Sequence, residues 1–297
     1  MTNTAGGVHW SLGLGHWSVD FTMSVRSDRI MPMTTCLLLD DAPQSGAWNM
    51  AVDEALLAAA DDRGEAAIRF YRWNEPTLSL GYFQAAADRA GHAASRDLPL
   101  VRRQSGGGAL VHDRELTYSI ALPATHPVTR QPPQLYRLTH DALTAALGAQ
   151  GVAVRPVGCG CSDEAATSCG EAPAADSPEP FLCFARRHPL DLIAADNNGD
   201  VAAPKFVGSA QRRRRGALLQ HGSLLLAKSA AAPELPGVQD VCGRDVDVAA
   251  LVDAVAAQLL DSLQLAVTAT APPRETKMAA EELAAQKYSS SGWNRRR

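Results

Sequence analysis

The chain has 297 residues, of which 46% are hydrophobic and 20% charged, a composition typical of a globular protein with a sizeable core. The 28 Lys and Arg residues against 32 Asp and Glu residues give a formal charge of −4, which excludes a generally basic nucleic-acid-binding protein. The six cysteines are only about 2% of the residues, far below the roughly 8–10% of a disulfide scaffold. Any functional cysteine therefore has a role other than forming a structural disulfide.

Residues 1–33 show no clear periodicity and are expected to form a poorly ordered extension. Glycines, His16 and Asp20 interrupt the apolar residues of this segment, which makes it a poor signal peptide. No run of about 18 apolar residues occurs anywhere, so no membrane helix is expected. We therefore expect a cytoplasmic protein with mostly reduced thiols, and the length permits one large domain or two smaller ones.

Hydrophobic periodicity predicts short strands interspersed with helices. Because strand and helix do not alternate regularly, the pattern predicts a mixed α/β or α+β domain without internal repeats. In chain order the expected elements are a helix over 46–62, strands over 68–73, 77–83 and 98–101, a half-buried strand over 116–122, a helix over 133–150, strands over 190–194, 205–209 and 218–227, and helices over 246–263 and 277–288.

Two segments between these elements have loop composition. Residues 158–180 contain small residues, five acids and no Lys or Arg, which predicts an acidic surface loop. Residues 195–204 are rich in turn formers and separate two predicted strands, which indicates a hairpin with a long tip.

The strongest local signal is the segment VRRQSGGGA at 101–109. Three adjacent glycines permit positive φ angles and the close approach of a ligand, and their amide groups can face an anion or a carbonyl. Two arginines add positive charge at the same place. The spacing matches neither a P-loop nor a dinucleotide-binding fingerprint, and a flexible hairpin turn is the structural alternative.

The cysteines fall into different classes. Cys159, Cys161 and Cys169 have no partner pair or histidine at zinc-finger spacing, so no metal site is expected. Cys183 follows the acidic loop and precedes a basic stretch at 186–188, where nearby cations would favour the reactive thiolate. A buried structural thiol is the alternative for Cys183.

A second candidate segment, KFVGSAQRR, begins at Lys205 and provides a floor of small residues. A lysine at such a position can hold a carbonyl or a carboxylate, and the alternative is a solvated cation at a strand end. His112 and His221 are potential acid–base or orienting groups, although histidines in such settings are more often structural.

Taken together, the segments resemble the lipoate-protein ligase and octanoyltransferase superfamily. The motifs NMAVDEALL, RRQSGGGALVHD, CF, KFVGSAQRR, LQHGSLLL and KYSSSGWN occur in the order seen there, and the resemblance covers about residues 35–295. It implies a single acyltransferase catalytic domain over residues 34–297, with the fold shared with biotin protein ligases. That fold has a central mixed and largely antiparallel sheet flanked by helices. That fold is related to the catalytic domains of class II aminoacyl-tRNA synthetases.

Within this superfamily, Cys183 resembles the cysteine of the cysteine-dependent octanoyltransferases. The ATP-using ligases typically carry Arg-Asn-Asp at the equivalent place. The resemblance implies transfer of an octanoyl group from octanoyl-acyl carrier protein to a lysine of a lipoyl domain, through a cysteine thioester. The implied acceptors are the E2 subunits of 2-oxoacid dehydrogenases and the glycine cleavage H protein. No ATP, metal or other cofactor is implied, because a thioester is already activated.

The same resemblance assigns the site residues. Cys183 is the implied nucleophile, and Lys205 is implied to favour the thiolate and to stabilise the oxyanion. These two residues lie 22 positions apart, farther than in the family, which we attribute to an insertion at the hairpin tip. The implied substrate-binding residues are Arg102, Arg103, Ser105, Gly106, Gly107, Gly108, His112, Gly208, Ser209, Ala210 and His221.

Three alternatives stay open at this point. They are an ATP-dependent lipoate-protein ligase, an amidotransferase that moves octanoyl between lipoyl domains, and a non-catalytic binder of the acyl group or of a lipoyl domain. The intact cysteine, lysine and glycine run argue against the binder. The arginine run at 212–215 is either a solvated face or a docking patch for acidic partners.

Overall fold

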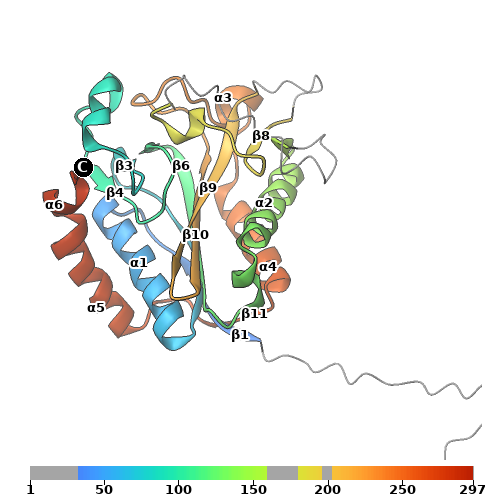
Figure 1. Ribbon diagram of the computed structural model, residues 1–297. Helices are drawn as coiled ribbons and strands as arrows, with labels where there is room; N and C mark the ends of the chain where they lie inside the picture. Colours follow the sequence, from blue (N-terminus) through green and yellow to red (C-terminus); the bar gives the residue numbers. More distant parts are fainter. Residues whose placement is uncertain (1–32, 159–179, 196–202, 297) are drawn as a thin grey trace, which may run out of the picture. The chain divides into compact units, whose positions relative to one another are not determined.

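The computed structural model describes residues 33–158, 180–195 and 203–296 (Figure 1). The expected N-terminal extension, most of the acidic loop and most of the hairpin tip therefore lie outside the described residues. Within the described ranges, no helix combines the length and the apolar content needed to cross a bilayer.

A mixed sheet of eight strands forms the centre, in the order β11-β1-β2-β6-β10-β9-β8-β7. Strand β1 is parallel to both β11 and β2, and every other neighbouring pair is antiparallel, which confirms the expected largely antiparallel central sheet. A smaller sheet has the order β4-β3-β5. The strands are β1 Thr34–Asp40, β2 Ala66–Tyr71, β3 Thr77–Leu80, β4 Leu100–Arg102, β5 Leu110–His112, β6 Glu115–Leu122, β7 Val154–Pro156, β8 Leu192–Ala194, β9 Lys205–Arg214, β10 Ala217–Leu225 and β11 Leu265–Ala269.

Helices cover both faces of the central sheet (Figure 1). Helices α1 and α5 pack against each other on one face, and α2 and α4 do so on the other. Each pair closes its own apolar cluster against the strands. The helices are α1 Gly46–Arg63, α2 Pro132–Ala149, α3 Val238–Cys242, α4 Val248–Ser262, α5 Arg274–Leu283 and α6 Ser291–Asn294.

The structure corrects several details of the predicted elements. Strand β6 is buried at every position rather than half-buried, because helices cover both faces and its polar residues face internal sites. The helix expected over 277–288 is α5 followed by a π turn at Ala284–Tyr288. Strands β1, β5, β7 and β11 were not predicted, because such short apolar runs carry too little periodicity.

Local sequence explains where α1 begins and ends. The Ser45 side chain accepts a hydrogen bond from the Trp48 amide and caps the N-terminus. Gly64 ends the helix with a φ of 70°, a left-handed conformation that favours glycine. The helix therefore has a fixed register, which decides which of its polar side chains point at the sheet.

One of those side chains, Asp53, forms a buried ion pair with Arg69 of β2. The Asp53 Oδ1 to Arg69 Nη1 distance is 2.9 Å, and both side chains are almost fully buried. The Tyr71 hydroxyl donates to the other carboxylate oxygen at 3.0 Å. Burial alone would raise the pKa of Asp53, but the hydrogen bond from His221 and the charge of Arg69 hold it below its usual value.

Replacing this carboxylate should destabilise the fold strongly. We expect Asp53→Ala to lower the free energy of unfolding by about 3–5 kcal/mol, because it removes the buried one of the two carboxylates that pair with the Arg69 guanidinium. Denaturant unfolding measures the difference. The matched control is Asp62→Ala, which removes a solvent-exposed ion pair with Arg215 and should cost no more than about 1 kcal/mol. Equal costs for the two variants would contradict the structural role of Asp53.

Candidate active site

The glycine run connects β4 to β5 and lies directly against the cysteine segment. The Ala109 amide donates to the Phe181 carbonyl at 2.9 Å, and the Cys183 amide donates to the Ala109 carbonyl at 2.7 Å. A Cβ atom on Gly108 would lie 2.9 Å from the Cys183 nitrogen, closer than real Cβ contacts allow. Gly107 has a φ of 91°, in the left-handed region. The glycines therefore permit the backbone contact that fixes the position of the cysteine.

Cys183 lies where an interior cavity meets an open groove. Met50, Leu110 and Phe184 contribute apolar walls to the cavity. Cys183, Ser209 and Ala210 line both spaces. Of the other predicted residues, the cavity is lined by Arg103, His112, Gly208 and His221, and the groove by Gly107 and Lys205. Within the described ranges Arg102, Ser105, Gly106 and Gly108 line neither space.

Lys205 is buried and contacts the backbone of the cysteine segment. Its ammonium lies 2.8 Å from Asp191 Oδ2, and it donates to the carbonyls of Cys183 and Arg186 at 3.3 Å. A Cβ atom on Gly208 would lie 2.9 Å from Lys205 Nζ, so glycine leaves room for the lysine to lie back over its own strand. Strands β8 and β9 pair antiparallel, which brings Lys205 close to Cys183 despite their separation in sequence.

The two adjacent arginines have different surroundings. Arg102 is fully buried and donates to the carbonyls of Gly81, Asn294 and Arg296. In return, the Trp293 indole donates to the Arg102 carbonyl. Arg102 therefore ties the C-terminal KYSSSGWN motif to the loop from outside the cavity.

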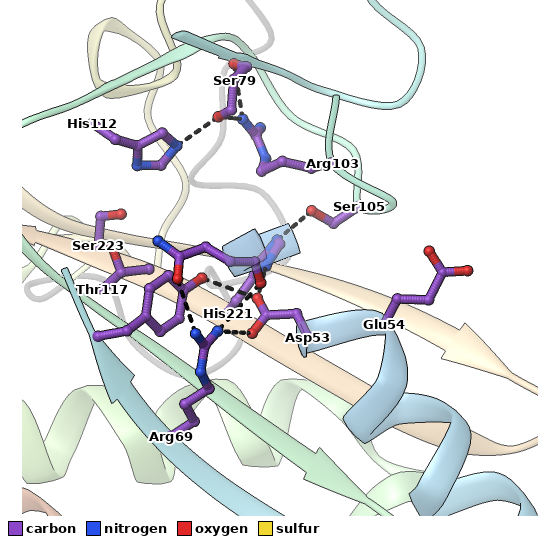
Figure 2. Close-up of polar contacts among 12 residues, drawn as sticks. Asp53, Glu54, Arg69, Ser79, Arg103, Ser105, His112, Thr117, His221 and Ser223 are labelled. Carbon is purple, nitrogen blue, oxygen red and sulfur yellow. Dashed lines mark hydrogen bonds and ion pairs between the residues drawn. The ribbon is translucent and has the colours of Figure 1, made fainter. Parts of the chain in front are cut away.

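Arg103 belongs to a hydrogen-bonded chain that runs through Ser79 and His112, as Figure 2 shows, and ends at the buried carboxylate of Glu115. Its Nη1 donates to Ser79 Oγ at 2.5 Å, Ser79 Oγ lies 2.6 Å from His112 Nε2, and His112 Nδ1 lies 2.6 Å from Glu115 Oε1. Burial lowers the pKa of His112, against the influence of Glu115, and this favours the neutral ring. A neutral ring accepts from Ser79 and donates to Glu115.

A second chain connects helix α1, strand β10 and the glycine loop (Figure 2). His221 Nδ1 lies 3.2 Å from Asp53 Oδ2, and His221 Nε2 lies 2.5 Å from Ser105 Oγ. Ser105 is buried and does not reach the cavity, so it positions the loop rather than contacting a ligand. The His221 ring itself lines the cavity.

Sequence reasoning missed the buried partners of these chains. Asp53 and Glu115 were detectable as acids within otherwise apolar patterns, whereas Ser79 gave no signal. His140 of α2 was also missed. Its Nε2 lies 2.8 Å from Ser209 Oγ, and burial lowers the pKa of His140 to about 4.

The arginine run at 212–215 is partly neutralised. Arg214 and Arg215 form ion pairs with Asp61 and Asp62, and the Arg212 guanidinium lies over the Tyr82 ring. The part of the chain described here contains no cluster of three or more metal-ligating side chains. The three cysteines at 159, 161 and 169 lie outside it.

Comparison with known proteins decides the family. The profile of the lipoyl protein ligase A/B catalytic domain matches residues 45–234. The chain belongs to this family. The match includes the glycine loop, Cys183, Lys205 and His221.

Its relatives within the family include several octanoyltransferases. Octanoyltransferase LipM of Brevibacillus brevis is 29% identical over 278 residues, which are 85% of this chain and 96% of the relative. Octanoyltransferase LipM of Kyrpidia tusciae is 37% identical over 202 residues, 65% of this chain and 67% of the relative. The Bacillus subtilis protein of the same name is 34% identical over 200 residues, 66% of this chain and 67% of the relative. The chain is accordingly an acyltransferase of this family.

Solved structures of lipoate protein ligases share the fold. Lipoate-protein ligase A bound with ATP has a TM-score of 0.63 and 23% identity, covering 89% of this chain and 98% of that one. The bipartite lipoate protein ligase of Thermoplasma acidophilum has a TM-score of 0.62 and 22% identity, covering 89% and 96%. At this identity the likeness establishes the fold alone.

The room that Gly208 leaves for Lys205 can be tested directly. We expect Gly208→Ala to slow acyl transfer by about 100-fold, because the new methyl group displaces the lysine that holds the cysteine segment. Transfer is followed by mass spectrometry of the acceptor, and circular dichroism checks the fold. The matched control is Gly148→Ala in α2, where a Cβ meets nothing within 4 Å and transfer should be unchanged. A fully active Gly208→Ala enzyme would contradict the contact.

Proposed function

We propose that this acyltransferase carries an octanoyl group as a thioester on Cys183, from octanoyl-acyl carrier protein to a lysine of a lipoyl domain. The proposed acceptors are the E2 subunits of 2-oxoacid dehydrogenases or the glycine cleavage H protein. The proposed compartment is the cytoplasm, where thiols stay reduced. The names of the relatives, all octanoyltransferases, support the choice of acyl group.

The observation that carries the proposal is the place of Cys183 between two different spaces. The cavity behind it has mostly apolar walls. The groove before it is open and lined by Lys205 and Asp191. The apolar walls suit an acyl chain, and the groove suits the approach of a carrier thiol and an acceptor amine in turn.

In the first step the Cys183 thiolate attacks the carbonyl carbon of the donor thioester. The bond between that carbon and the carrier sulfur breaks, and the carrier leaves as a thiol after taking a proton from water. The negative charge that develops on the carbonyl oxygen is met by the amides of the glycine run, because none of the described residues accepts a hydrogen bond from them. Lys205 holds the cysteine segment in place for this step through the Cys183 and Arg186 carbonyls.

In the second step the neutral ε-amine of the acceptor lysine attacks the thioester on Cys183. An amide bond forms, the bond from carbon to the Cys183 sulfur breaks, and the amine loses a proton to solvent. The thiolate is restored, and no ATP is consumed because the donor is already activated.

The covalent step predicts an isolable acyl-enzyme. After incubation with octanoyl-acyl carrier protein alone, intact mass spectrometry should show one octanoyl adduct that hydroxylamine removes. Cys183→Ala should abolish both the adduct and the transfer. The control is Cys242→Ala in α3, which lines neither the cavity nor the groove and should form the adduct normally. Full transfer by Cys183→Ala would exclude the thioester.

The donor distinguishes the remaining alternatives. We expect rapid transfer from octanoyl-acyl carrier protein, and no pyrophosphate release with lipoate and ATP. Pyrophosphate release that persists in Cys183→Ala would instead establish a ligase. Preferential use of an octanoylated lipoyl domain as donor would establish an amidotransferase with the same cysteine.

A further inference from the structure

Two cations, Lys205 and Arg103, lie near Cys183, and the structure gives them different surroundings. The Lys205 ammonium is in contact with the Asp191 carboxylate. It also donates hydrogen bonds to the backbone carbonyls of Cys183 and Arg186. Its charge is therefore largely balanced, and its contacts fix the shape of the cysteine segment.

Arg103 is buried and has no carboxylate within ion-pair distance among the described residues. Its Nη1 donates to the Ser79 carbonyl and hydroxyl, and its Nη2 donates to the carbonyls of Gly106 and Gly108. Its Nε is buried without an acceptor. The nearest carboxylate along its hydrogen bonds is Glu115, which it reaches through Ser79 and His112. Figure 2 shows these two intermediate side chains.

The guanidinium and the cysteine sulfur border the same small space. A Cβ atom placed on Gly107 would lie 3.6 Å from Arg103 Nη2 and 3.7 Å from Cys183 Sγ. Arg103 and Cys183 also line the same cavity. Gly107 leaves this space open, so no side chain of the loop separates the cation from the sulfur.

Electrostatics favour a negative charge at this place. Burial lowers the pKa of Arg103, and the strongest opposing influence is a negative charge on Cys183. An arginine nevertheless stays protonated at every physiological pH, so the buried charge persists. A thiolate beside it provides the missing counter-charge.

The other charged and titratable groups around the cysteine complete the field. Arg186, Arg187 and His188 belong to its own segment, and Lys205 and Asp191 come from the β8–β9 side. The remaining titratable groups that line the cavity or the groove are His112, His221, Tyr71 and Tyr136. Glu115 and Asp53 lie behind these two histidines and bond to them. Arg103 alone among these cations combines complete burial, a shared cavity wall with the sulfur, and no bound carboxylate.

We infer that Arg103 is the residue that stabilises the Cys183 thiolate, while Lys205 positions the cysteine segment. Ionisation of the thiol releases one proton to water through the groove and leaves a negative sulfur in the field of the buried guanidinium. In the proposed transfer the same field stabilises the thiolate when it leaves in the second step. This inference deepens the proposed function. Only its last part, the stabilisation of the thiolate that leaves in the second step, rests on that function.

The test measures the thiol without any acyl donor. The alkylation rate of Cys183 by iodoacetamide is followed between pH 5 and 10 by peptide mass spectrometry, which separates it from the other cysteines. For Arg103→Gln we expect the pH of half-maximal rate to rise by about one unit or more, a tenfold weaker ionisation. The plateau rate at high pH should stay within about threefold, because a thiolate formed by base needs no partner.

Further variants separate charge from structure. Lys205→Gln should move the pH midpoint less than Arg103→Gln does, and Arg213→Gln, an exposed arginine of β9, should not move it. If Arg103→Gln does not fold, Arg103→Lys serves instead, because it keeps a cation at this position. The pH midpoint of alkylation for Arg103→Lys should lie between those of the wild type and Arg103→Gln.

An unmoved midpoint in a folded Arg103→Gln protein would overturn the inference, as would a larger shift in Lys205→Gln. Because no donor is present, these outcomes are independent of whether an acyl-enzyme forms. If Arg103→Gln raises the pH midpoint of alkylation as expected but the wild-type enzyme forms no octanoyl adduct, the proposed function is rejected and the role of Arg103 is kept.

Discussion

The backbone contact between the glycine run and the cysteine segment is the constraint on which the site depends. It joins Ala109 to Phe181 and Cys183 by two hydrogen bonds, and it needs Gly108 because a Cβ there would overlap the Cys183 backbone. The contact places the sulfur at the boundary between the apolar cavity and the open groove. Without it, the Cys183 sulfur would not lie at this boundary.

Much of the remaining structure supports the two partners of this contact. Arg102 and the C-terminal motif hold the loop from one side, and the chain from Asp53 through His221 to Ser105 holds it from α1. Lys205 holds the cysteine segment through its carbonyls. Such buried polar chains are costly to break and define a single arrangement, which is what a reaction between two large substrates requires.

Several sites were predictable because their residue types are locally unusual. Three adjacent glycines after two arginines, a cysteine before a basic stretch, and a lysine before small residues are each visible in one segment. The helix at 46–63 was predictable from its apolar spacing and its terminal glycine, whereas β1, β7 and β11 were not, because three to seven residues carry little periodicity. The prediction that the strand at 116–122 is half-buried was wrong. Alternation of apolar and polar residues cannot show that helices cover both faces of the sheet.

The sequence by itself determined the family resemblance, the glycine loop and the cysteine segment that lies against it, because these are properties of short segments. Only the tertiary structure decided what the two adjacent arginines contact. Arg102 faces the C-terminal segment, and its neighbour Arg103 faces the cavity and the sulfur, although the two are identical in type. Neighbouring side chains of an extended segment point in opposite directions, and what each meets there comes from distant parts of the chain.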